Sequence, residues 1–95
     1  MGGPVRPTWT FLSNYAHVLL CIAKNPDTRV RDIAVDVGIT QRAVARILTE
    51  LETAGVVDRE RKGRRNHYTL RLDAPLRHPL ESHSTVGDLL GALER

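Results

Sequence analysis

Two groups of basic and amide side chains are the residues of this chain whose types and spacing could do chemistry. Gln41, Arg42 and Arg46 are spaced so that a helix would carry them on its outward side. Arginine can donate paired hydrogen bonds to guanine, and glutamine can pair with adenine. The second group surrounds Gly63 and consists of Arg61, Lys62, Arg64, Arg65 and Asn66. Cations gathered in this way neutralise phosphates, so both groups predict contact with a nucleic acid.

Each group also has an interpretation that involves no sequence recognition. Arg42 and Arg46 could contact phosphate alone, which positions a protein on DNA without reading its bases. The cations around Gly63 could form a charged hairpin that only keeps the protein soluble. The overall charge favours an anionic partner only weakly, because 14 Lys and Arg against 11 Asp and Glu give a net charge of +3.

Apolar periodicity predicts the helices that must position the first group. After Ser13, a candidate N-cap, apolar residues recur at helical spacing until Asn25 and Pro26 end the first helix. A second helix is expected over 31–37 and a third over 41–54, because apolar residues recur there with the same period. The predicted core faces of these two helices consist of Ile33, Ala34, Val37, Val44, Ile47, Leu48 and Leu51.

The junction between the second and third helices has the sequence of a tight turn. Ala34 is small enough for two helices to cross closely, and Gly38 suits a helix end with positive φ. Thr40 is a good N-cap for the helix that follows. These features predict a helix-turn-helix, whose second helix is free to enter a groove of DNA.

Alternating apolar residues predict that the second basic group lies on a hairpin. Strands are expected at 56–61 and 66–72 around a turn at Gly63. The strand face toward the helices would consist of Tyr68, Leu70 and Leu72. The short connection 27–30 is expected to add one more strand to this small sheet.

Both ends of the chain carry apolar groups that need a partner. Trp9 and Phe11 are expected to be buried, and 73–84 is expected to be irregular. Thr85 then begins a final short helix, with Asp88 placed to complete a capping box. The apolar stripe of that helix consists of Val86, Leu89, Leu90 and Leu93. Trp9 and this stripe could close over the core of their own subunit or pair with a second copy.

The segments VRDIAVDVGITQRAVARILTELETAGVV and GRRNHYTL resemble the helix-turn-helix and the wing of MarR-type and ArsR-type transcription regulators from bacteria and archaea. The resemblance extends from Ser13 to Leu72. It implies a mainly α fold with a small β-sheet (α+β), namely a winged helix-turn-helix with a three-helix core, a two-stranded wing and a short C-terminal helix. A typical MarR protein is longer than this chain, and the metal-sensing cysteines of ArsR proteins are missing.

The same resemblance implies how DNA would be bound. The third helix would lie in the major groove and the wing on the flanking backbone or minor groove. Carried over by position, the contact residues are Thr40, Gln41, Arg42 and Arg46 on the helix, with Lys62, Arg64, Arg65 and Asn66 on the wing. Most members bind as homodimers to partly palindromic operators.

These arguments lead to a sequence-specific regulator that binds double-stranded DNA as a homodimer, with repression as the role that the resemblance implies. We expect a flexible tail at 1–7, a DNA-binding domain at 8–72, and a C-terminal extension at 73–95 that serves dimerisation or docks on the core. Two alternatives are a winged-helix module for protein contact and a sequence-independent architectural DNA binder.

Other classes of function find little support in the residues. No nucleophile with a base, glycine-rich phosphate loop or acidic dyad is recognisable, so we expect no enzyme. The four histidines match no zinc pattern, and we expect neither a metal nor a cofactor. Cys21 is expected to be a small core residue, with redox sensing as a weaker alternative.

The expected location and ligands follow from what the sequence lacks. The longest apolar run, 18–23, is far shorter than the roughly 20 residues that span a bilayer. We therefore expect a cytoplasmic, nucleoid-associated protein with no membrane contact. A small-molecule effector could bind between Trp9, the first helix and a partner subunit, but no convergent polar group marks such a site.

Overall fold

The computed structural model describes residues 6–94, so residues 1–5 of the expected flexible tail lie outside the described residues. Its elements are α1 (Asn14–Lys24), α2 (Val30–Val37), α3 (Gln41–Thr53), β1 (Val57–Lys62), β2 (Arg65–Leu70) and α4 (Val86–Leu93). This order confirms the predicted α+β winged helix-turn-helix. Within the described residues, no helix has the length and apolar character needed to cross a membrane.

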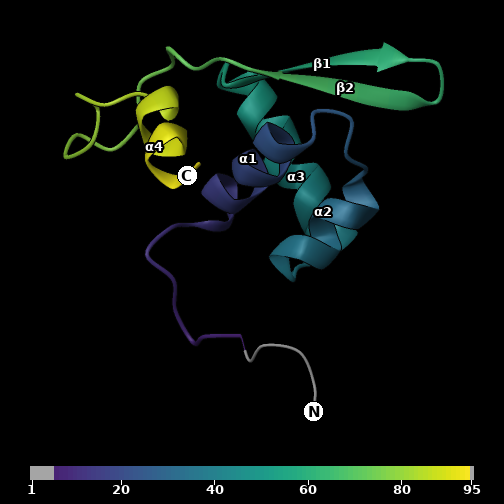
Figure 1. Ribbon diagram of the computed structural model, residues 1–95, viewed down its shortest axis with the longest axis horizontal. Coiled ribbons are helices and arrows are strands. Elements are labelled where there is room, and N and C mark those ends of the chain that lie inside the picture. Colours follow the sequence, from purple (N-terminus) through teal and green to yellow (C-terminus); the bar gives the residue numbers. More distant parts are fainter. Residues whose placement is uncertain (1–5, 95) are drawn as a thin grey trace.

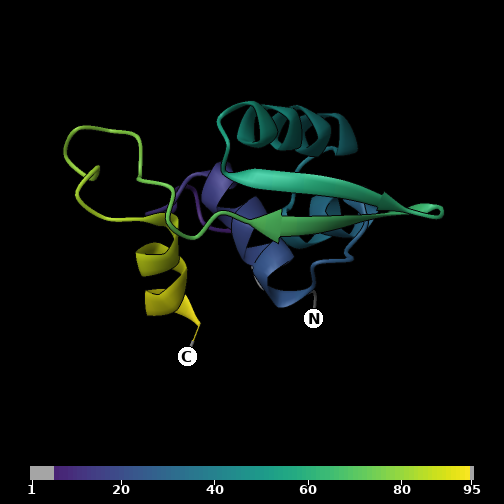
Figure 2. The same cartoon turned by 90° about the horizontal axis from the view of Figure 1, so that it is seen from above.

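The first three helices form a bundle, and the β1–β2 hairpin projects beyond it as a wing (Figure 1). Seen from above, α4 lies at the opposite end of the molecule from the wing tip (Figure 2). The bundle closes around side chains that are almost fully buried, namely Val18, Ile22, Ile33, Val44, Leu48 and Val57. Burying one such aliphatic side chain contributes about 1.5–3 kcal/mol, so this core fixes how α3 is held.

The turn before α3 forms as its sequence predicts. Gly38 ends α2 with φ of +87°, and its N–H donates to Ala34 O at 2.8 Å. The Thr40 hydroxyl accepts from Ala43 N at 3.1 Å, which caps the first turn of α3. Ser13 takes the N-cap position of α1, although its side chain makes no capping hydrogen bond.

Changing Gly38→Ala should lower the free energy of unfolding by about 1–2 kcal/mol, because an L-residue is strained at this positive φ. The added Cβ would also lie 2.9 Å from Cζ of Arg6, which must then move. Urea unfolding followed by circular dichroism measures the change. The control is Gly91→Ala in α4, where no atom of the described residues lies within 4 Å of the added Cβ and a gain of about 0.5–1 kcal/mol is expected. Equal unfolding midpoints for both variants would contradict the prediction.

The wing is an antiparallel hairpin. Val57 pairs with Leu70 at its base and Lys62 with Arg65 at its tip, and Gly63 turns the chain with φ of +64°. Tyr68 is buried against the helices and Leu70 is half-buried against the same core, as the alternation predicts; Val57, which pairs with Leu70, is buried as well. The prediction for Leu72 is wrong, because β2 ends at Leu70 and the side chain of Leu72 is exposed.

The segment 27–30 forms no strand, and among the described residues the sheet has only β1 and β2. Thr28 N–H donates to Asn25 O at 3.0 Å, which curls this segment into a turn, and Val30 already begins α2. One hydrogen bond, from Tyr68 N–H to Pro26 O at 2.9 Å, joins the segment to the wing. Because the turn directs the chain away from β2, the described residues form no second backbone hydrogen bond of this kind.

Trp9 and Phe11 are not buried, contrary to expectation. Their side chains are 67% and 92% exposed, and their rings meet edge to face with centroids 4.9 Å apart. The extended segment before α1 runs outside the bundle, and the core is closed by Val86 and Leu90 of α4 instead. Cys21 packs against the core but is only half-buried, and that burial raises the pKa of its thiol.

The C-terminal helix α4 is capped as predicted, since Thr85 Oγ1 accepts from Asp88 N at 3.1 Å and Thr85 N–H donates to the Asp88 carboxylate at 2.9 Å. Val86 and Leu90 belong to the bundle core, whereas Leu93 remains 47% exposed. One side of α4 therefore docks on its own subunit and the other stays open. The preceding segment is irregular, apart from an isolated bridge between Pro75 and Thr85.

Candidate nucleic-acid interface

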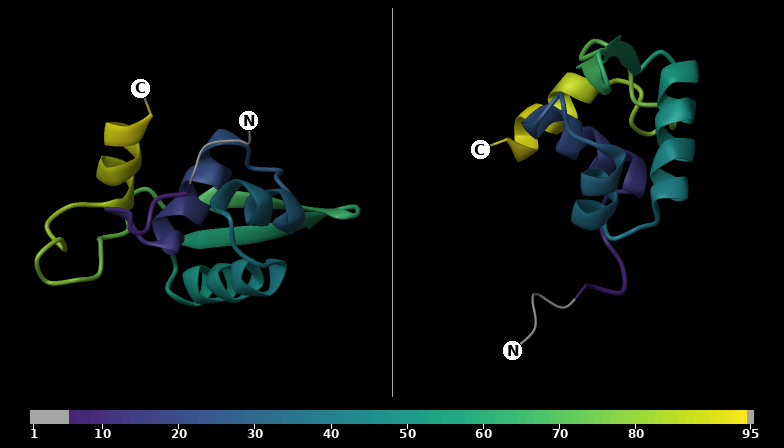
Figure 3. Two further views of the ribbon diagram at one scale, coloured as in Figure 1. Left: turned by 90° about the horizontal axis from the view of Figure 1, so that it is seen from below. Right: turned by 90° about the vertical axis from the view of Figure 1, so that its right-hand side faces the viewer.

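Helix α3 presents one side to the core and leaves the other open. Its inward side chains Val44, Ile47, Leu48 and Leu51 are all buried. The outward side carries exposed residues: Gln41, Arg42, Ala45, Arg46 and Thr49. The right-hand view of Figure 3 shows α3 along one flank, with no other element over its outer side. The structure thus gives α3 the free, polar surface that a helix needs to enter a groove.

The N-terminal end of α3 carries two exposed polar side chains, Gln41 and Arg42. Among the described residues, Arg42 takes part in no ion pair. The helix dipole adds partial positive charge at this end. The hydroxyl of Thr40 accepts in its cap but still has a proton to donate. This end can therefore attract and hydrogen-bond an anionic or acceptor-rich ligand.

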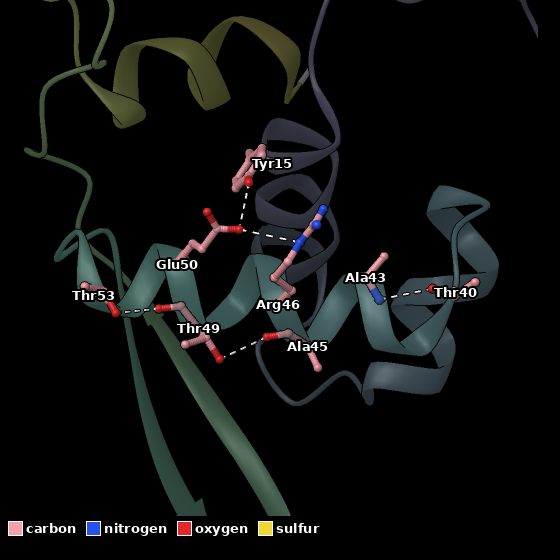
Figure 4. A network of polar contacts seen from close by, with 8 residues as sticks. All are labelled: Tyr15, Thr40, Ala43, Ala45, Arg46, Thr49, Glu50 and Thr53. Carbon is pink, nitrogen blue, oxygen red and sulfur yellow. Dashed lines mark hydrogen bonds and ion pairs between the residues drawn. The ribbon is translucent and has the colours of Figure 1, made fainter.

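Arg46 lies one turn further along α3 and belongs to a small network (Figure 4). Its Nε is 3.7 Å from Oε1 of Glu50, and its side chain is 72% exposed. The hydroxyl of Tyr15, on α1, donates to the same Oε1 at 2.8 Å. This hydrogen bond to the Glu50 carboxylate raises the pKa of Tyr15 above its ordinary value. Arg46 is paired at one nitrogen while the rest of its guanidinium faces solvent.

Sequence reasoning missed Tyr15 and Glu50. The spacing of Arg46 and Glu50 is visible in the sequence as an i,i+4 pair. Tyr15 lies 35 residues before Glu50, and no local pattern joins them. Further along the helix, Thr49 and Thr53 donate their hydroxyl protons to Ala45 O and Thr49 O.

The wing tip carries four exposed cations, which differ in their contacts with the rest of the protein. Arg61 donates from Nε to Gly63 O at 3.2 Å, and Lys62 lies 3.5 Å from Glu60. Arg64 and Arg65 form no ion pair among the described residues. The register sets Lys62 directly opposite Arg65, although like charges opposite each other destabilise a hairpin. An anion at the tip would relieve this repulsion.

Other cations of the wing are bound within the protein. Arg71 donates from Nε to Asp58 at 2.6 Å, and this contact raises the pKa of Arg71. Arg59 lies 3.0 Å from Oε1 of Glu52, close enough for an ion pair but without hydrogen-bond alignment. These pairs brace the base of the wing and leave the free positive charge at its tip.

The middle of β2 is also joined to the turn that precedes α2. Nδ1 of His67, on β2, lies 2.7 Å from Oδ1 of Asp27. A hollow of about 190 Å³ nearby is lined by Asp27, Arg29, Arg64 and Arg65, among others. Arg29 is a further exposed cation that sequence reasoning missed, because it falls in a segment that the pattern predicts as a strand. Asn66 is half-buried and pairs with Arg61 across the hairpin.

The two predicted groups face a common end of the molecule. Seen from above, α3 begins at the end toward which the wing tip extends, and α4 lies at the other end (Figure 2). The fold thus brings residues 41–46 and 61–66 to one side of the protein. A surface hollow of about 1140 Å³ lies elsewhere, between Trp9, α1 and α2, and includes both polar and apolar side chains. No group of three or more potential metal ligands is formed by the described residues.

Comparison with known proteins supports the sequence resemblance. The family model of the MarR family matches residues 13–65. A search of curated proteins finds no significant match.

Solved structures show the same fold. One is a predicted DNA-binding transcriptional regulator from E. coli, with a TM-score of 0.59 and 16% identity over 83% of this chain and 72% of the other. A second is the PcaV transcriptional regulator from Streptomyces coelicolor in complex with its natural ligand, with a TM-score of 0.57 and 22% identity over 87% of this chain and 57% of the other.

A third is a MarR family transcription regulator, with a TM-score of 0.52 and 17% identity over 84% of this chain. This chain spans 57% of the length of the PcaV regulator and 47% of the length of this third protein. The family match, residues 13–65, covers the first three helices, β1 and the wing tip up to the first residue of β2.

Proposed function

Because this chain belongs to the MarR family and is a winged helix-turn-helix transcription regulator, we propose that it binds a specific sequence of double-stranded DNA as a homodimer and acts as a repressor. The observation that carries the proposal is the outward side of α3, where Gln41 and Arg42 are exposed and Arg42 forms no ion pair among the described residues. The free cations of the wing tip lie toward the same end of the molecule. Repression rests on the family resemblance alone.

The proposed contacts divide between base reading and phosphate binding. Thr40, Gln41, Arg42 and Arg46 face the major groove, where side chains of these types can distinguish base pairs. The wing residues Arg61, Lys62, Arg64, Arg65 and Asn66 hold the flanking backbone or minor groove. Arg64 and Arg65 contribute most, because Arg61 and Lys62 already interact within the hairpin. This assignment makes α3 the source of specificity and the wing the main source of electrostatic affinity.

The proposed dimer uses the end of the molecule opposite the wing tip. Trp9 and Phe11 are large, exposed aromatic residues, a type enriched at protein interfaces. Phe11 lines an apolar hollow of about 640 Å³ together with Leu89 of α4, and Leu93 is exposed on the same helix. A two-fold dimer formed here leaves both α3 helices free, which suits half-sites about 34–36 Å apart. In this division, 8–72 binds DNA and 73–95 both docks on the core and contributes to the dimer.

Selection of bound fragments from random duplex DNA tests the proposed function. We expect one enriched sequence, bound about 10³-fold or more tightly than a scrambled duplex at physiological salt. Arg42→Ala should weaken binding to that sequence about tenfold, which is the loss expected for one base-reading side chain. Arg31→Ala is the matched control, because Arg31 is an exposed arginine of α2 that lies outside both proposed DNA-binding groups and outside the proposed dimer contact.

The outcomes separate the proposal from its alternatives. Binding without any preferred sequence would indicate an architectural DNA binder, and the proposed specificity would be wrong. A complete lack of duplex binding would favour a module for protein contact. An Arg42→Ala variant that binds as tightly as the wild type would remove Arg42 from the contact set.

A further inference from the structure

We propose that Glu50, held by Tyr15, is a positioning residue that aims Arg46 at a guanine base. The inference rests on the proposed function, because it assigns the role of one side chain at the same DNA interface. It decides between the two interpretations of Arg46, base reading and phosphate contact. The contacts that carry it are the 2.8 Å hydrogen bond from Tyr15 to Glu50 and the 3.7 Å approach of Glu50 to Arg46.

The pairing of Arg46 leaves free the part of the side chain that recognises guanine. Glu50 approaches Nε, so Nη1 and Nη2 keep their protons for other acceptors. Guanine offers O6 and N7 as two neighbouring acceptors in the major groove, and a guanidinium can meet both at once. Figure 4 shows the Glu50 carboxylate between the Tyr15 hydroxyl and Arg46.

Tyr15 supplies the rigidity that an exposed ion pair lacks. A glutamate on a helix surface has several rotatable bonds, and an exposed pair with arginine stabilises a protein little. Here a second helix fixes the carboxylate, because α1 packs on the core through Ala16 and Leu19 and brings the Tyr15 hydroxyl to Glu50. The carboxylate is therefore held in place before DNA arrives, which reduces the entropy lost when Arg46 is ordered.

The charge of Glu50 favours base reading over phosphate contact. A carboxylate beside Arg46 partly cancels its attraction for phosphate, and it would repel a phosphate that came close. Arg42 has no such neighbour among the described residues. The two arginines of α3 thus differ in their surroundings: Arg46 is restrained by a carboxylate, which suits directional hydrogen bonds, and Arg42 is not.

The test uses the DNA sequence selected by the full chain and its single base-pair variants. We expect Arg46→Ala to abolish discrimination at one G·C pair, and Tyr15→Phe to reduce discrimination at that pair about threefold to tenfold. Glu50→Gln should reduce the same discrimination while strengthening binding to scrambled duplex, because it removes a negative charge. Tyr15→Phe in an Arg46→Ala background should have no further effect, since a double-mutant cycle isolates their coupling.

Two controls keep the result interpretable. Asp36→Asn removes one negative charge from an exposed residue of α2, outside the proposed DNA and dimer contacts, and should change neither discrimination nor binding to scrambled duplex. The salt dependence of binding should be unchanged in Tyr15→Phe, because no phosphate contact is lost. The unfolding midpoint of each variant is compared with that of the wild type. Because Tyr15 and Glu50 are exposed, we expect the midpoints of their variants to lie close to the wild-type value.

The inference is overturned if Tyr15→Phe and Glu50→Gln leave discrimination unchanged at every base pair of a site that the wild type reads. It is also overturned if Arg46→Ala weakens binding to all sequences equally and makes the logarithmic salt slope shallower by about 0.9, as loss of one phosphate contact would do. Both results leave the proposed function intact. A wild type that selects no sequence overturns the proposed function and, with it, this inference.

Discussion

Replacing Arg64 and Arg65 together with alanine is expected to make the logarithmic salt dependence of duplex binding shallower by about 1.8, because each neutralised phosphate contributes about 0.9. The wild type should then lose about 12-fold more affinity than the variant when salt rises from 50 mM to 200 mM. Both arginines are exposed at the wing tip and form no ion pair among the described residues, so their full charge is available to DNA. Fluorescence anisotropy with a labelled duplex at several salt concentrations measures the slope.

The control for this prediction removes the same amount of charge elsewhere. Lys24→Ala with Arg31→Ala takes two exposed cations from outside the two proposed DNA-binding groups and should leave the slope unchanged. An unchanged slope in the Arg64 and Arg65 variant would exclude the wing from the interface. An equal change of the salt slope in both variants would mean that the salt dependence reflects the net charge of the protein and not contacts at the wing tip.

Changing Trp9→Ala with Phe11→Ala should convert the proposed dimer to a monomer at micromolar concentrations, because large aromatic anchors carry much of the energy of an interface. Loss of the dimer should weaken binding to DNA with two half-sites by about 10²–10⁴-fold, since the second contact is no longer intramolecular. Binding to a single half-site should not change. Sedimentation velocity gives the mass, and anisotropy with one and two half-sites gives the affinities.

Val35→Ala is the matched control, because Val35 is also a large exposed apolar residue but lies on α2. It should remain dimeric. If the Trp9 and Phe11 variant keeps the wild-type mass and affinity, the dimer contact lies elsewhere, and the open side of α4 with Leu93 becomes the next surface to test.

Local chemistry explains why the sequence predicts so much of this fold. Gly38, Thr40 and Asp88 act within a few residues of where they stand, and their structural roles follow from residue type. The core face of α3 follows from the helical period in the same way. The outward direction of Arg42 and Arg46 is the complement of that face, so the exposed part of the candidate site on α3 could also be predicted.

The features that sequence reasoning missed depend on contacts between distant parts of the chain. Tyr15 and Glu50 are separated by 35 positions, and Asp27 and His67 by 40. Neither pair leaves a local signature. Trp9 and Phe11 were expected to be buried because of their size, but burial also requires an uncovered part of the core, and α4 fills that place.

The outer half of the wing has little part in holding the fold together. Only Val57 of β1 is buried, and the other residues of that strand face water. If the wing tip contacts DNA as proposed, substitutions near Gly63 change those contacts at small cost to folding, whereas most substitutions on the inward side of α3 damage the core. Over evolutionary time, single replacements at the wing tip would then change the preference for flanking DNA while the scaffold remains under constant selection.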